Sequence, residues 1–310
     1  MSTDSISLGD VEITRVVEWG GPISTAAFVV PDSDPDLWRA NSSWLAPDFW
    51  RPEDDACLAN VQTWVLRSEG RTILVDTGVG NDRDRPQVPL FAGLRTTFLD
   101  RLAAAGVRPE DVDVVINTHI HYDHVGWNTR LRDGDWVPTF PNATYLVPRA
   151  DNLYFDPRGP GPGRPPRDEH ERSRWQGSEL VFNDSIAPIH QAGQALLWDG
   201  TYRVDGNLVL RAAPGHTPGS SVLHLASRTD RAVFVGDILH SPVQILRPDC
   251  NSCFCDNPAQ AAATRRSVLG QAADSNALVV PAHFPGHGAT AVRRSGEDFV
   301  LNGWAGFSRT

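Results

Sequence analysis

The feature that most constrains this chain of 310 residues is the segment Thr118–His124, where three histidines and one aspartate follow the order H-x-H-x-D-H. Imidazole nitrogen and carboxylate oxygen are donors for zinc, iron and manganese. In an α-helix, His119 and His121 would point about 200° apart around the axis and could not share one ion. On extended or loop backbone these two histidines lean to the same side, and Asp123 and His124 turn toward a neighbouring point. The spacing therefore predicts two half-built metal sites.

The residues before this cluster indicate where it lies in the fold. Positions 111–117 are rich in β-branched residues and apolar in their second half, which is typical of a buried strand. Ligands in a loop at the end of a strand sit on a rigid edge where a coordination position can face solvent. The alternative is a histidine-rich surface turn that includes a carboxylate by chance, and the buried strand disfavours it.

A site for two ions needs more donors, and three segments elsewhere place a donor after an apolar run. These are His216 after 208–210, Asp237 after 232–236, and His283 after 278–282. Two divalent ions, two aspartates and a shared hydroxide would leave about one positive charge, which suits an electron-rich carbonyl or phosphoryl oxygen.

Each of these donors has an ordinary alternative. His216 lies in a Pro/Gly turn and could be a simple loop histidine, and Asp237 could cap a helix. His287 competes with His283, and we favour His283 because it directly follows the strand. We expect all three to bind metal.

Taken together, these residues resemble the metallo-β-lactamase-fold hydrolase superfamily, over a span that runs from Val75–Gly78 to His283. The resemblance implies an α/β fold of the α+β type, a four-layer αββα sandwich of two mixed β-sheets flanked by helices. It also implies a role for each donor. His119, His121 and His216 would hold the first ion, Asp123, His124 and His283 the second, Asp237 would bridge both, and Asp76 would orient the ligands from outside.

Two segments of the chain share one pattern. Positions 65–76 and 222–237 both consist of a strand, a turn, a second strand and a final aspartate. This similarity suggests two related halves that pack face to face.

Particular positions narrow the resemblance to one branch. One major class of true β-lactamases has a cysteine near Asp237, and flavin-linked di-iron oxidoreductases have glutamate at the position of His121, so neither activity is favoured. The segment 236–244 is most similar to the branch that holds methyl parathion hydrolase and the quorum-quenching lactonases. Many acyl-homoserine lactonases have tyrosine where this chain has His240, which is a candidate for stabilising an oxyanion, for protonating a leaving group, or for a simple pocket wall.

The leading hypothesis is a dinuclear metal-dependent hydrolase of a lactone or carboxylic ester, in which a metal-bridging hydroxide attacks the carbonyl. Asp123 or Asp237 would accept or pass protons, and His240 completes the candidate catalytic set. We expect two divalent ions, with Zn2+ first and Mn2+, Fe2+ or Co2+ as alternatives. A phosphotriester or aryl phosphate hydrolase is the second candidate, and a mononuclear iron thiol dioxygenase or a non-catalytic metal-binding protein is the third.

Composition limits the partners and the organisation. The donors run from 119 to 283 and must converge, so we expect a single domain over 1–310 with insertions at about 31–60 and 126–200. The net charge of −10 argues against nucleic acid and leaves a small-molecule substrate. Residues 1–8 show no secretion signal, and no apolar run approaches the roughly 20 residues of a membrane span, so we expect a cytoplasmic protein. A homodimer is left open.

The remaining signals are local. No C-x-x-C pair elsewhere in the sequence matches the cluster of Cys250, Cys253 and Cys255, so these three and Cys57 are interpreted as reduced cysteines, with a redox or accessory-metal role as the alternative. The spacing predicts helices at 94–105, 168–179 and 258–269. The Trp-rich stretch 31–55 would either wall the active site or pack on the core.

Overall fold

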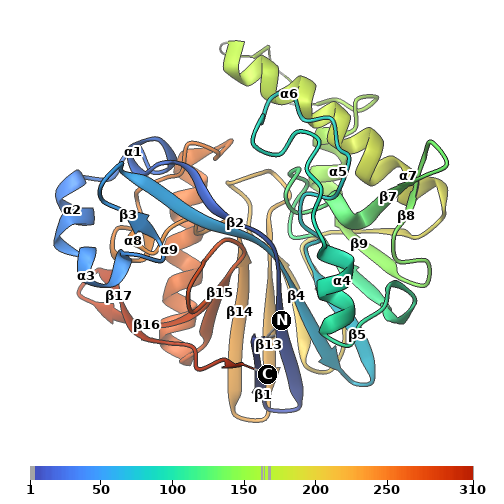
Figure 1. Cartoon of the computed structure of the whole chain (residues 1–310). Helices are drawn as coiled ribbons and strands as arrows, with labels where there is room; N and C mark the ends of the chain where they lie inside the picture. The colour runs from blue at the N-terminus through green and yellow to red at the C-terminus, as the bar shows by residue number, and fades with distance from the viewer. Residues whose placement is uncertain (1–3, 162, 164, 167–168, 310) are drawn as a thin grey trace.

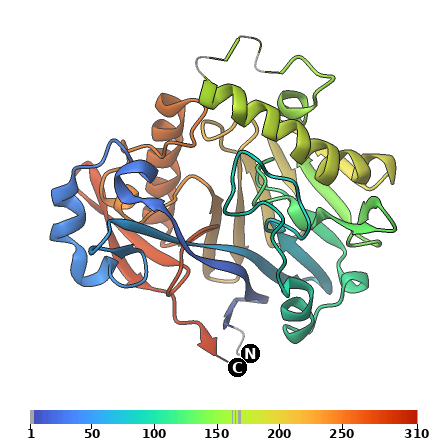
Figure 2. The same cartoon turned by 45° about the horizontal axis from the view of Figure 1, so that its top comes forward.

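The computed structural model describes residues 4–161, 163, 165–166 and 169–309. In this part of the chain, two mixed β-sheets pack face to face, and helices cover both outer faces (Figures 1 and 2). The four-layer αββα sandwich expected from the sequence is confirmed.

Within the described residues the first sheet has nine strands, eight of them in the order β10-β9-β6-β5-β4-β2-β1-β18, with β3 paired to β4. Its strands are β1 (Asp4–Leu8), β2 (Val11–Thr25), β3 (Trp50–Arg51), β4 (Ala56–Ser68), β5 (Arg71–Val75), β6 (Val114–Ile116), β9 (Thr144–Pro148), β10 (Ala195–Trp198) and β18 (Ser308–Arg309).

The second sheet of the described chain has seven strands in the order β11-β12-β13-β14-β15-β16-β17. They are β11 (Thr201–Arg203), β12 (Leu208–Ala212), β13 (Ser221–Ser227), β14 (Asp230–Gly236), β15 (Leu278–Pro281), β16 (Thr290–Ser295) and β17 (Asp298–Trp304). A separate hairpin is formed by β7 (Thr129–Arg132) and β8 (Asp135–Pro138).

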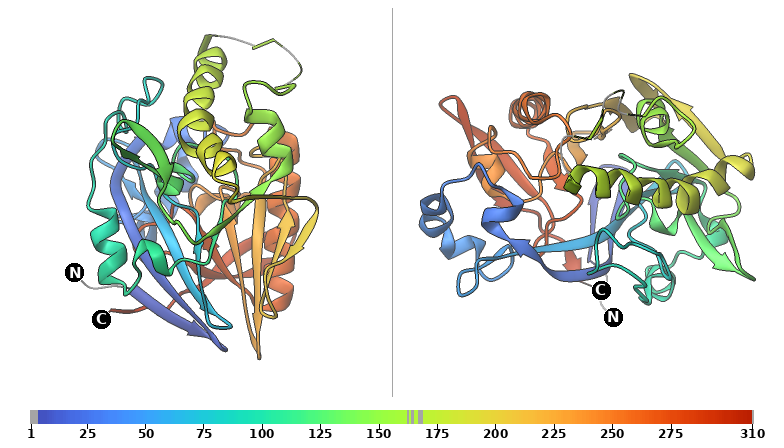
Figure 3. Two further views of the ribbon diagram at one scale, coloured as in Figure 1. Left: turned by 90° about the vertical axis from the view of Figure 1, so that its right-hand side faces the viewer. Right: turned by 90° about the horizontal axis from the view of Figure 1, so that it is seen from above.

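The helices divide between the two outer faces (Figure 3). Those against the first sheet are α4 (Phe98–Ala104), α5 (Arg149–Phe155), α6 (Glu169–Val181) and α7 (Ala187–Gln191). Those against the second are α1 (Ala26–Val29), α2 (Pro35–Ala40), α3 (Ser42–Leu45), α8 (Val243–Leu246) and α9 (Pro258–Ser275). A π-helical turn at 182–186 joins α6 to α7.

Alternation along the central strands explains the layers. In β4, Trp64 and Leu66 join the core between the sheets, whereas Val65 packs on the opposite side under α4. In β14, Phe234 meets Trp64 edge to face, with ring centroids 6.1 Å apart, and Val233 points toward α9. Because successive side chains of a strand point to opposite faces, each central strand contributes to two cores.

The two predicted hairpins are present, and they lie in different sheets. Strands β4 and β5 are joined by Glu69 and Gly70, both with positive φ, as a tight hairpin with the right-handed strand twist requires. Strands β13 and β14 form the second hairpin. The strands that follow by crossover, β6 and β15, pair in parallel with β5 and β14. The carboxyl ends of these four strands therefore meet at one edge of the sandwich.

Some expected boundaries differ from the structure. Helix α4 begins at Phe98 rather than 94, because Leu94 packs in a small cluster with Phe91. Helix α9 begins at Pro258 as expected and continues to Ser275. Helix α6 matches the predicted polar helix, whose first position, 168, lies outside the described residues.

The segments expected as insertions also contribute to the sandwich. The range 126–200 contains β9 and β10, so only part of it stands outside the two sheets, and β4 begins at Ala56, before the expected end of the first insertion. Trp38, Leu45 and Phe49 are buried in the core beside the second sheet, so these residues of the Trp-rich stretch pack on the core. Among the described helices, none is both long and apolar enough to cross a membrane.

The core between the sheets gives a first test. Leu223 is fully buried on β13, whereas Leu131 on β7 is 46% exposed. We expect Leu223→Ala to lower the free energy of unfolding by about 2–5 kcal/mol, through lost burial and a residual cavity. The matched control Leu131→Ala should change it by less than about 0.5 kcal/mol. Urea unfolding of the two variants checks this, and equal losses would contradict the assignment of the core.

Candidate metal centre

The structure brings the seven predicted donors together at the edge where the carboxyl ends of the strands meet. Within the described residues they form two groups, in each of which the ligand atoms lie within 4.8 Å of one another. The groups are His119, His121, His216 and Asp237, and Asp123, His124 and His283. The segment after β6 supplies both groups, and the segments after β12, β14 and β15 complete them.

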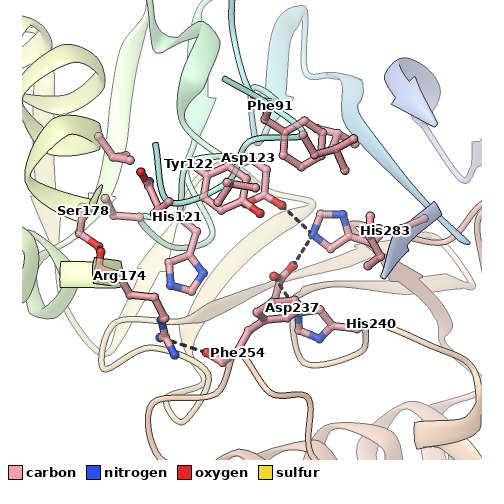
Figure 4. A pocket seen from close by; sticks show the side chains of 18 of the residues that line it. Phe91, His121, Tyr122, Asp123, Arg174, Ser178, Asp237, His240, Phe254 and His283 are labelled. Atoms are coloured by element: carbon pink, nitrogen blue, oxygen red, sulfur yellow. Dashed lines mark hydrogen bonds and ion pairs between the residues drawn. The ribbon is translucent and has the colours of Figure 1, made fainter. Parts of the chain in front are cut away.

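Asp237 lies between the two groups and turns one carboxylate oxygen to each. Its Oδ2 is 3.3 Å from His216 Nε2 and 3.7 Å from His119 Nε2. Its Oδ1 is 3.1 Å from His124 Nε2 and 3.0 Å from His283 Nε2. Figure 4 shows this carboxylate pointing toward the His283 ring. A carboxylate in this orientation can bind two cations at once.

Hydrogen bonds to residues outside the cluster determine which nitrogen of each ring in the second group carries the proton. The backbone carbonyl of Asn60 only accepts, so His283 Nδ1–H donates to it at 2.8 Å. His124 Nδ1–H donates in the same way to Asp76 Oδ2 at 2.8 Å. In the neutral rings the two Nε2 atoms then carry lone pairs, and these atoms face each other at 3.2 Å. Two facing lone pairs repel unless positive charge lies between them, so the donor set fits a metal cation.

A similar chain orients the first group. Asp76 accepts from the backbone N–H and the hydroxyl of Thr118, the latter at 2.9 Å. The Thr118 oxygen is then free to accept from His119 Nδ1–H at 3.1 Å, which leaves the lone pair of His119 Nε2 facing the cluster. His121 Nδ1 is 3.1 Å from His119 Nε2 and 3.0 Å from His216 Nε2. Three nitrogens that converge in this way are better suited to binding a shared cation than to hydrogen bonding with one another.

The pKa of His283 shows the same demand for positive charge. Burial disfavours a charged His283, but the carboxylates of Asp237 and Asp123 outweigh burial and raise the pKa of this ring to about 9. Burial, followed by the nearby charge of His124, holds the pKa of His119 well below its ordinary value. In the metal-free protein, a proton on His283 therefore supplies part of the positive charge between the donors.

Asp151 positions the first group without touching it. This fully buried carboxylate of α5 accepts from Ile120 N–H at 2.9 Å, from the Thr217 hydroxyl at 2.9 Å, and from Gly219 N–H. A Cβ at Gly219 would lie 2.5 Å from the backbone nitrogen of Asp151, so glycine permits this close approach. Asp151 thereby ties the loop of the clustered histidines to the turn that carries His216. No pattern in the sequence could have identified it.

Glu18 plays a comparable part beside the second group. It lies buried in β2 and accepts from Val79 N–H and from Trp127 Nε1–H, both at 2.6 Å. These contacts join the loop after Asp76 to the turn that follows the histidine cluster.

His240 is next to the bridging carboxylate. Its Nε2 is 3.1 Å from Asp237 Oδ2, and its buried Nδ1 has no hydrogen-bond partner among the described residues. His287, the alternative to His283, stacks on Trp304 at 5.5 Å and belongs to neither group. Among the described residues no cysteine joins either group, and all four cysteines are free.

A pocket of about 330 Å³ opens over the donors (Figure 4). Asp123, Asp237 and His283 lie on its lining, as does His240. The rest of the lining is mainly apolar and comes mostly from β2, α1, β4, the loop 87–91, α5, α6 and the segment around Phe254.

Comparison with known proteins identifies the family. The family model of the metallo-beta-lactamase superfamily matches residues 58–283. This span covers more than half of the chain and contains all seven donors. The chain belongs to the metallo-beta-lactamase superfamily.

Curated relatives are similar over part of their length. An N-acyl homoserine lactonase of Bacillus cereus is 26% identical over 180 residues, which is 54% of this chain and 59% of the relative. The cytochrome P450 monooxygenase mpaDE of Penicillium roqueforti is 28% identical over 235 residues, 66% of this chain and 25% of the relative. The chain thus spans less than two thirds of either relative.

Two solved structures share the fold over almost their whole length. The hydrolase AbOPH of the β-lactamase superfamily has a TM-score of 0.77 and 22% identity, and covers 97% of this chain and 96% of its own. AidC, a dizinc quorum-quenching lactonase in complex with a product, has a TM-score of 0.76 and 19% identity, and covers 99% of both chains.

The buried carboxyl of Asp151 gives a pH test. Burial raises its pKa from 3.8 to about 7, although its hydrogen bonds oppose the shift. The folded state therefore holds a proton that the unfolded state releases between about pH 4 and 7, and this contribution to stability is lost as the pH rises through that window. In metal-free protein, we compare the free energy of unfolding of the wild type with that of Asp151→Asn. We expect the difference, wild type minus variant, to fall from pH 4 to pH 7. Urea titrations at several pH values measure it, and a constant difference would contradict the shift.

Proposed function

We propose that this protein is a dinuclear metal-dependent hydrolase that opens a lactone or cleaves a carboxylic ester. The observation that carries the proposal is Asp237, whose two oxygens face two separate groups of nitrogen and oxygen donors. Membership of the superfamily and the similarity to an N-acyl homoserine lactonase support it.

The donors divide between two ions. His119, His121 and His216 would hold the first, Asp123, His124 and His283 the second, and Asp237 both. Asp76 would orient the rings through Thr118 and His124. Imidazole and carboxylate donors suit Zn2+, and Mn2+, Fe2+ and Co2+ accept the same atoms.

The chemistry divides between the ions and the chain. When bound, two divalent ions lower the pKa of a shared water and polarise a substrate carbonyl oxygen. Asp123 Oδ2 lies 3.5 Å from His283 Nε2 and borders the pocket, where it can accept a proton. His240 lines the same pocket and can donate to a developing oxyanion or to the leaving oxygen.

The pocket supports a small-molecule substrate. Its volume of about 330 Å³ is within the range of small-ligand sites, and most of its lining surface is apolar. A phosphotriester could occupy the same place, so a panel of lactones, esters and phosphotriesters decides between these substrates. A mononuclear dioxygenase would use a single group of donors, whereas two groups favour two ions.

Replacement of the bridging carboxylate tests the proposal. We expect Asp237→Ala to lower ester or lactone turnover by about 10³-fold or more and to lower the metal content below two ions per chain. Asp249→Ala, which removes an exposed carboxylate paired with Arg266, is the control and should keep both. Elemental analysis and kinetics measure the effects, and an Asp237→Ala protein with full activity would refute the bridging role.

The role of His240 is tested separately. We expect His240→Phe to keep two ions per chain, because the seven donors remain, while kcat falls by about 10²-fold through loss of a proton donor. His287→Phe, at a ring outside the two donor groups, should keep the kcat of the wild type. A His240→Phe protein with unchanged kcat would leave this ring as a pocket wall only.

A further inference from the structure

One wall of the pocket carries a cation that the proposed chemistry does not use. Arg174 extends from α6 toward the segment of Phe254 and lies beside His121 (Figure 4). It is the only arginine or lysine among the described residues that line the pocket. The apolar part of the lining includes Phe28, Leu90 and Phe91.

The hydrogen bonds of Arg174 leave most of its donors free. Its Nη2 donates to Asp256 Oδ1 at 2.9 Å and approaches the carbonyl of Phe254 at 3.5 Å. Among the described residues, Nε and Nη1 have no hydrogen-bond partner, and the side chain keeps 24% of its surface exposed. A guanidinium that is anchored on one side therefore presents three N–H groups on the others.

These donors have a defined chemical complement. A planar guanidinium binds a carboxylate through paired, charge-assisted hydrogen bonds, and in a mostly apolar pocket such bonds are stronger than in water. We infer that Arg174 selects substrates that carry a carboxylate on an arm apart from the bond that is cleaved, with an apolar body against Phe28, Leu90 and Phe91. This inference names the substrate class of the proposed hydrolase and rests on that function for its kinetic test.

A substitution at Asp256 distinguishes carboxylate recognition by Arg174 from a purely structural role of Arg174. In the free protein its carboxylate occupies Arg174 Nη2 and competes with a bound anion. Asp256→Asn removes that competing charge, so recognition by Arg174 predicts tighter binding of a carboxylate. If the ion pair only held α6 to the segment 254–256, Asp256→Asn and Arg174→Gln would weaken binding of every ligand alike.

Binding to the metal-free protein tests the inference without turnover. The probes are 4-phenylbutyrate and its neutral amide, measured by isothermal titration calorimetry. We expect wild type to bind the carboxylate about 10-fold or more tightly than the amide. Arg174→Gln should abolish this preference, Arg174→Lys should keep part of it, and Asp256→Asn should increase it. Arg172→Gln on the same helix, where Arg172 is exposed and pairs with Glu169, is the matched control.

Kinetics with loaded enzyme provide the second arm. One matched pair is the 4-nitrophenyl half ester of glutaric acid and 4-nitrophenyl pentanoate, and the other is γ-carboxy-γ-butyrolactone and its primary amide. For at least one pair, we expect Arg174→Gln to lower kcat/KM of the charged member by about 10- to 100-fold and that of the neutral member by less than about twofold. Absence of turnover on all four would count against the proposed function, and the binding arm would still decide the role of Arg174.

Two results would overturn the inference. One is a wild-type protein that binds the two phenylbutyrate probes equally. The other is an Arg174→Gln protein that keeps the wild-type preference, whether or not it binds both probes more weakly. Thermal unfolding shows whether each variant is folded, and Arg174→Lys replaces Arg174→Gln in the comparison if the latter is not.

Discussion

The structure depends on one local constraint, the convergence of buried lone pairs on two points. In their neutral form, His124 and His283 turn the lone pairs of Nε2 toward each other at 3.2 Å, because each ring gives its other N–H to an acceptor outside the cluster. Neither ring can relieve the repulsion by turning away, since its orientation is set by the hydrogen bond at its other nitrogen. The site is therefore organised for positive charge before any ion arrives, and Asp237 supplies the negative charge shared by both points.

Three buried acidic residues hold this arrangement in place from outside. Asp76, Asp151 and Glu18 all accept backbone N–H groups, and each joins loops that are far apart in the sequence. A loop whose backbone N–H groups are bound by a carboxylate holds its side chains in fixed positions, whatever those side chains are. Rigid ligand loops beside a mostly apolar pocket suit a site in which the substrate varies and the chemistry stays the same.

The sequence predicted those parts of the site that follow a strand. The clustered histidines, Asp237 and His283 could be located because each comes directly after a short apolar run, and parallel strands end at one edge. Asp151 and Glu18 could not, because a carboxylate that bonds to a distant backbone leaves no periodic pattern. The same limit applies to the fold. Strands β9 and β10 were hidden in a range expected to be an insertion, and the start of α4 was missed because Leu94 has its apolar contacts in a loop.

The division of the donors between the sheets has a mechanical consequence. In the first group, His119 and His121 follow the first sheet while His216 and Asp237 follow the second. In the second group, Asp123 and His124 lie across from His283. Each ion would thus crosslink the two sheets, and separating the sheets would require breaking coordinate bonds. The ions would then raise the free energy of unfolding in proportion to the logarithm of their free concentration. The same centre would thus serve both reactivity and stability.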